Sequence, residues 1–198
     1  MNLDNQKECF KNHVATFTDY GNIKILDFKN PDSSSYRIRF LFEEDYCRLH
    51  ISGDLGELIA TNYNNMTYDK FSDFVNNVDY FKEKIDCCSR DIYRYNEDAA
   101  RQQLIEMGNN HAWLFSSTDY EWEDDEDDRL NDIVDDILCD FDTDNGISNR
   151  GYVALCELES DAFEFVSDLG KEETGILDLY MLAFKLAKQQ IDTQTDIE

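Results

Sequence analysis

Apolar and polar side chains alternate along the N-terminal part of the chain, and this pattern limits the fold more than any other feature. Residues 36–42 read Tyr, Arg, Ile, Arg, Phe, Leu, Phe, and residues 47–51 read Cys, Arg, Leu, His, Ile. A period of two is typical of strands that bury one face. An apolar run from Ile23 to Phe28 adds a further strand. Turn-forming residues at 20–22, 30–33 and 52–56 separate these segments, which predicts an antiparallel meander of three to five strands.

Helical spacing replaces this alternation after Thr61. Apolar residues recur at steps of three and four from Phe71 to Ile85, which predicts a helix that begins near Thr67 or Tyr68. A second helix is expected over 97–107, with Asn96 as its N-cap and Gly108 as its stop. Residues 162–169 and 176–191 are expected to form two closing helices.

These patterns together predict the α+β class, with an N-terminal antiparallel β-sheet packed with helices and an acidic, helical C-terminal half. A length of 198 residues suits one domain over 1–198. Within it, residues 1–64 are expected to be mainly β-sheet, 65–110 helices, and 111–198 the acidic helical half. Hydrophobic residues make up 41% of the chain, which argues against wholesale disorder.

Negative charge is concentrated in the second half of the chain. The chain has 44 Asp and Glu against 18 Lys and Arg, a net charge of -26. Residues 1–100 carry 12 basic and 18 acidic side chains, whereas residues 101–198 carry six and 26. Such a protein repels phosphate backbones and anionic lipid, so we expect no direct binding to nucleic acid or to a membrane surface.

The cysteines and the N-terminus point to a reducing compartment. Six cysteines occur without a C-x-x-C pair, and the first ten residues lack the apolar core of a secretory signal. No segment approaches the apolar length of a membrane span. We therefore expect free thiols and a location in the cytoplasm, that of a bacterial host cell if the resemblance described below holds.

The most unusual segment is acidic and lies between residues 119 and 144. It contains fourteen carboxylates and one base, Arg129, and residues 123–128 are all acidic. Taken alone, such a run is most often a solvated loop. The following apolar residues recur at helical spacing and predict an amphipathic helix: Leu130, Ile133, Val134, Ile137, Leu138 and Phe141. Carboxylates occupy the opposite face of that helix: Asp128, Asp132, Asp135, Asp136 and Asp140.

A helical row of aspartates is a candidate partner-binding surface. Like charges at i and i+4 destabilise a helix, and Asp is a poorer helix former than Glu, so solubility alone would favour Glu. Carboxylates held in a row resemble the phosphates of a nucleic-acid strand. Trp122 is a candidate apolar anchor, while Trp113 and Phe115 suit ordinary packing. The candidate partner-binding residues are Glu121, Trp122, Glu123, Asp124, Asp125, Glu126, Asp127, Asp128, Asp132, Asp135, Asp136 and Asp140.

Other chemistry lacks a complete motif. The segment from Asp140 to Ile147 resembles a calcium loop, but Asn145 stands where Gly is needed and Gly151 stands where the bidentate carboxylate is needed. The three histidines and six cysteines lack zinc-finger spacing. Nothing singles out one pair of acids for hydrolysis. We therefore expect no enzyme activity, no metal and no cofactor.

Two features resemble anti-defence proteins of phages and mobile elements. A small, reduced, strongly acidic chain resembles anti-CRISPR proteins that act as DNA mimics. Residues 30–38 and 51–57 are also similar to uncharacterised proteins from phages and mobile elements of Gram-positive bacteria. The resemblance implies no catalytic residues; it implies a basic nucleic-acid-binding partner, a CRISPR effector nuclease, whose DNA-binding groove is blocked.

Two other hypotheses remain at this point. The protein is alternatively an acidic, chaperone-like shield for basic proteins, or a hydrolase with an unrecognised carboxylate site. A homodimer is expected as often as a monomer.

Overall fold

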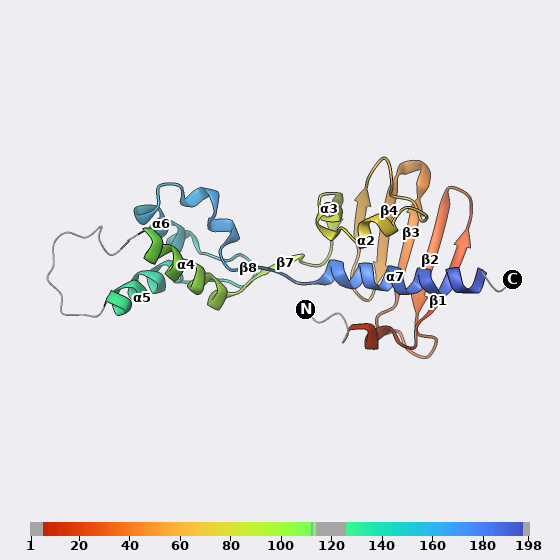
Figure 1. Ribbon diagram of the computed structural model, residues 1–198, viewed down its shortest axis with the longest axis horizontal. Coiled ribbons are helices and arrows are strands. Elements are labelled where there is room, and N and C mark those ends of the chain that lie inside the picture. The colour runs from red at the N-terminus through yellow and green to blue at the C-terminus, as the bar shows by residue number, and fades with distance from the viewer. Residues whose placement is uncertain (1–5, 112, 114–125, 196–198) are drawn as a thin grey trace. The chain divides into compact units, whose positions relative to one another are not determined.

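The computed structural model describes residues 6–111, 113 and 126–195, and these form two compact units (Figure 1). The first comprises Met1–Ile92 and Gly175–Glu198 and is called the sheet unit below. The second, Tyr93–Thr174, is called the inserted unit because it interrupts the sheet unit in sequence. This division differs from the single domain, with internal boundaries at 64 and 110, that the sequence suggests. The difference arises because the C-terminal helix returns to the N-terminal sheet.

The sheet unit is built on a six-stranded antiparallel meander in which each strand pairs with the next along the chain. Its strands are β1 (Val14–Asp19), β2 (Ile23–Lys29), β3 (Ile38–Glu43), β4 (Arg48–Gly53), β5 (Leu58–Thr61) and β6 (Ile85–Cys88). Short 3-10 helices η1 (Glu8–Phe10) and η2 (Glu44–Tyr46) lie before β1 and before β4. Gly21, at φ 81°, completes the β1–β2 turn, where Tyr20 donates its amide to the Ile23 carbonyl over 2.8 Å. The antiparallel meander and the α+β class are confirmed, but the sheet has six strands instead of the expected three to five, because Ile85–Cys88 adds β6 beside β5.

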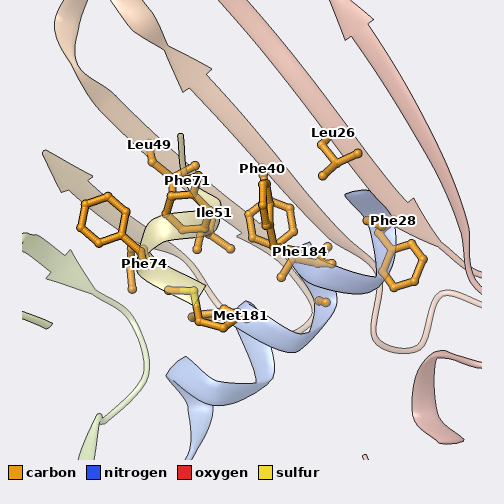
Figure 2. Packing of buried hydrophobic residues seen from close by; sticks show 14 of the residues in the cluster. Leu26, Phe28, Phe40, Leu49, Ile51, Phe71, Phe74, Met181 and Phe184 are labelled. Atoms are coloured by element: carbon orange, nitrogen blue, oxygen red, sulfur yellow. The ribbon is translucent and has the colours of Figure 1, made fainter. Parts of the chain in front are cut away.

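One face of the sheet carries the core. Alternate residues of β2 to β5 are fully or almost fully buried, including Leu26, Phe40 and Ile51. Helix α7 (Ile176–Thr195) packs against this face (Figure 1). Its Phe184 ring contacts the rings of Phe40, Phe42, Tyr68 and Phe71 at centroid distances of 4.8–6.2 Å. Figure 2 shows Phe184 and Met181 of α7 facing the sheet residues.

The helix expected from Thr67 to Ile85 is wrong. The structure has two short helices there, α2 (Ser72–Val75) and α3 (Val78–Lys82), and Ile85 begins β6. Asn77, at φ -145°, breaks the helical path and caps α3 by accepting the amide of Tyr80 over 3.1 Å. The apolar spacing is nevertheless used, because Phe71, Phe74 and Phe81 are all fully buried.

Three α-helices, two 3-10 turns and a two-stranded sheet lie in the described part of the inserted unit. The strands are β7 (Tyr93–Tyr95) and β8 (Lys171–Glu173), and the helices are α4 (Glu97–His111), α5 (Glu126–Ile137) and α6 (Asn149–Leu158). A second core joins them, with Leu104, Val134 and Leu155 fully buried. Because Tyr93 is the register partner of Glu173, the two ends of the unit lie side by side.

Two details of this unit differ from expectation. Asn96 caps α4 as predicted, accepting the amide of Ala99 over 3.2 Å. Gly108 does not stop that helix; it lies buried inside α4, where a Cβ would come within 2.5 Å of Leu130 Cδ1. The helix expected over 162–169 is replaced by two 3-10 turns, η4 (Ala162–Glu164) and η5 (Val166–Asp168).

Candidate partner-binding surface of the inserted unit

The charge of the chain is segregated by unit. Between Tyr93 and Thr174 there are 24 acidic and five basic residues, a net charge of -19. The sheet unit contains 20 acidic and 13 basic residues, a net charge of -7 over a longer stretch of chain. Self-repulsion at this density destabilises a compact fold. The inserted unit therefore keeps a charge that works against its own stability.

Helix α5 is anchored by its apolar side, as its spacing predicts. Leu130, Val134 and Ile137 are buried in the second core. Helix α6 approaches α5 closely at Gly151, where a Cβ would lie 1.9 Å from the Ile137 carbonyl oxygen. Ser148 begins α6 by accepting the amide of Gly151, and its hydroxyl donates to the Cys139 carbonyl over 2.7 Å. Helix α5 is therefore held in place by the second core and by its close contact with α6.

The opposite side of α5 presents carboxylates to solvent. Asp128, Asp132, Asp135 and Asp136 are all exposed. Six acids occur among the twelve residues of α5. At about 1.5 Å rise per residue the helix spans about 18 Å, or about 3 Å per carboxylate. One strand of DNA carries one charge per about 3.4 Å of helix axis, so the two linear charge densities are similar.

Arginines that the sequence analysis did not connect to this row neutralise part of it. Arg101 of α4 donates to Asp135 over 2.6 Å, and Arg150 of α6 donates to Asp136 over 3.0 Å. Both pairs are exposed to solvent, so each contributes about 0–1 kcal/mol to stability. Their partners lie 34 and 14 residues away in sequence, and only the helix packing brings them together.

Asp128 and Asp132 form the unpaired part of the row. Among the described residues, neither makes an ion pair. Asp128 belongs to the first turns of α5, where the helix dipole favours negative charge. Asp132 lies mid-helix and has no such compensation.

The remaining candidate residues are placed as follows. Asp140 lies in a turn three residues beyond the end of α5, in the left-handed region at φ 60°, so it does not extend the helical row. Glu126 and Asp127 open α5. Five candidates lie outside the described residues, as does Phe115: Glu121, Trp122, Glu123, Asp124 and Asp125.

Glu159 is a partly buried carboxylate, with its side chain 12% exposed, that the sequence analysis did not single out. Its Oε1 accepts hydrogen bonds from Trp113 Nε1 at 2.6 Å and from His111 Nδ1 at 2.5 Å. Burial alone would raise the pKa of Glu159, but the two hydrogen bonds and the His111 charge outweigh it and hold that pKa below its ordinary value. Trp113 is 4% exposed, as its assignment to packing predicts. This cluster ties the C-terminal end of α4 to the end of α6.

In the acidic loop after α5, the Asp142 carboxylate is hydrogen-bonded to backbone amides of the same loop. Asp142 Oδ1 accepts the amides of Asp144 and Asn145 at 3.0 and 2.9 Å, and these bonds lower the pKa of Asp142. Within the described ranges, no three His, Cys, Asp or Glu side chains converge as a metal site requires. All six cysteines are free thiols.

Searches with protein-family models, curated proteins and solved structures found no significant match to this chain. In the part of the chain that the structure describes, no helix combines the length and apolarity needed to span a bilayer.

Proposed function

We propose that the protein is a non-enzymatic inhibitor whose inserted unit binds the basic nucleic-acid-binding groove of another protein. The observation that carries the proposal is the net charge of -19 on one small folded unit, with exposed aspartates fixed along α5. A groove that binds phosphates presents Lys and Arg, and it accepts carboxylates at similar spacing without a change of chemistry. The resemblance to anti-CRISPR proteins makes a CRISPR effector nuclease in a bacterial cytoplasm the partner class we propose.

Fixed carboxylates favour such a partner over a loosely bound one. A mobile acidic tail pays conformational entropy when a partner orders it. Helix α5 is already ordered because Leu130, Val134 and Ile137 pack in the core. Its aspartates therefore lose little further conformational entropy when a partner binds. The summed negative field also steers a basic partner toward this unit and makes association fast and sensitive to salt.

The test is affinity capture from bacterial lysate with matched charge variants. The reversal Asp128→Lys with Asp132→Lys alters two aspartates of α5 that make no ion pair among the described residues. We avoid Asp135 and Asp136 because reversing them would set two lysines against Arg101 and Arg150. The control, Asp32→Lys with Asp73→Lys, makes the same charge change at exposed sites of the sheet unit.

The proposal predicts capture of one nucleic-acid-binding protein at moderate salt by the intact chain and by the control. The α5 variant should lose that protein. Capture of many basic proteins that all dissociate at high salt would contradict the proposal and indicate a general shield. Equal capture by both variants would also contradict it.

A further inference from the structure

An aromatic cleft lies within the inserted unit, apart from the exposed face of α5. It has a volume of about 360 Å³. Its apolar walls come from β7, α6 and the two 3-10 turns, together with the loop before α6: Tyr95, Ile147, Tyr152, Phe163 and Val166. The volume is at the small end of ligand pockets, which span about 300–1,000 Å³, and suits a side chain of a partner rather than a large cofactor.

One wall of the cleft is held in place by contacts within the unit, and another is exposed to solvent. Tyr95 is fixed because its hydroxyl donates to the Ser167 carbonyl over 3.1 Å and its ring packs on Gly146. A Cβ at Gly146, which has φ +77°, would lie 2.7 Å from the ring. Phe163, by contrast, is 64% exposed, so the described residues leave one apolar wall of the cleft open to solvent.

The charge around the cleft decides which partner side chain fits it. The described residues that line it include no charged side chain. Asp144 and Glu164 adjoin the lining residues Asn145 and Phe163 in sequence, both are exposed, and neither makes an ion pair among the described residues. Aromatic walls in a unit with a net charge of -19 favour a planar cation, because a guanidinium stacks on rings and is attracted by the negative field of the unit.

We propose that this cleft binds an arginine side chain of the protein partner and thereby anchors the complex. The inference rests on the proposed function, since it assigns the residue type that the partner presents next to its basic groove. Arginine is favoured over lysine because the lysine ammonium is compact and cannot stack. Arginine and aromatic residues are also the usual anchors of protein interfaces.

Labelled hexa-arginine and hexa-lysine peptides test this proposal by fluorescence anisotropy with the full chain. We expect hexa-arginine to bind more tightly. Phe163→Ala should weaken hexa-arginine binding by about three- to tenfold and leave hexa-lysine binding unchanged. Val153→Ala is the matched control, because Val153 is 54% exposed on α6 but does not line the cleft. Tryptophan fluorescence confirms that each variant remains folded.

Two results would contradict the proposal that the cleft binds arginine. One is equal binding of the two peptides by the intact chain, and the other is an arginine preference that survives Phe163→Ala. The peptide assay does not depend on the capture experiment. If an arginine preference requires Phe163 but no nucleic-acid-binding protein is captured, arginine binding in the cleft is supported and the proposed function is refuted. If the partner is captured but the chain shows no arginine preference, only arginine binding in the cleft is refuted.

Discussion

The stability of the sheet unit should depend on whether the inserted unit is folded. The insertion is 82 residues long, and strands β7 and β8 hold its ends together. Directly opposed residues of antiparallel strands have Cα atoms about 5 Å apart. A folded insertion therefore acts on the sheet unit as a short loop, whereas an unfolded one acts as a long loop.

The magnitude follows from loop-closure entropy. Lengthening a loop from about 4 to 82 residues costs (3/2)RT ln(82/4), which is about 2.7 kcal/mol with RT at about 0.59 kcal/mol. Replacing residues 93–174 by about four glycines should thus leave the unfolding free energy of the sheet unit almost unchanged. Val134→Asp, which places a carboxylate in the fully buried core of the inserted unit, should unfold that unit and lower the sheet unit's stability by up to about 2.7 kcal/mol.

Urea unfolding with two probes separates the units. Both tryptophans, Trp113 and Trp122, belong to the inserted unit, so tryptophan fluorescence reports on that unit alone. Circular dichroism of the β-sheet follows the sheet unit. The reasoning is refuted if the shortened chain does not fold, or if Val134→Asp abolishes the fluorescence transition and leaves the sheet transition in place. A loss far above 2.7 kcal/mol would show that the units stabilise each other by more than chain connection.

Three further changes have defined outcomes. Gly151→Ala should destabilise the inserted unit by at least about 1–3 kcal/mol in tryptophan-monitored urea unfolding, because its Cβ would overlap the Ile137 carbonyl; wild-type stability would refute the close approach of the helices. Phe184→Ala should cost the sheet unit about 3–5 kcal/mol by circular dichroism, since the ring is fully buried; a loss below about 1 kcal/mol would contradict that packing. The pKa of Glu159 is lowered by folding, so its contribution is fully present above the ordinary Glu pKa and disappears as pH falls through the folded pKa. Glu159→Gln should therefore lower the inserted unit's stability at pH 7 by about 1–2 kcal/mol and flatten its decline below about pH 4.5, and an unaltered pH profile would exclude this role.

Local patterns in the sequence predict the elements whose periods are long and regular. The alternation around Phe40 and Ile51 predicts the central strands, and the closing helix expected over 176–191 corresponds to α7. The apolar spacing from Leu130 predicts the buried side of α5. In each case one face of the element packs against a core, so apolar residues recur in the sequence with the period of a strand or a helix.

Features that depend on distant contacts do not show in the same way. The stripe from Phe71 to Ile85 satisfies a helical period, yet Asn77 breaks it and Ile85 pairs with Ala60 in the sheet. The sequence suggests that Gly108 stops a helix. In the structure this position lies inside α4 and has no room for a side chain, because Leu130 and Trp113 pack against it. The division into two units follows from the return of α7 to the sheet, which no local period records.

The same limit applies to the candidate surface. The sequence identifies the acidic row of α5, because spacing alone puts Asp128 and Asp132 on one face. It does not identify Arg101 and Arg150 as partners of that row. It also misses the aromatic cleft, whose walls come from residues as distant as Tyr95 and Val166.

Competition between this protein and nucleic acid for the captured partner tests the central claim most directly. A labelled nucleic acid bound to that partner is titrated with the intact chain, with Asp128→Lys/Asp132→Lys and with Asp32→Lys/Asp73→Lys. A nucleic-acid mimic displaces the label stoichiometrically, and the α5 variant loses this ability while the sheet-unit control retains it. A ternary complex in which partner, nucleic acid and this protein remain together would contradict the account.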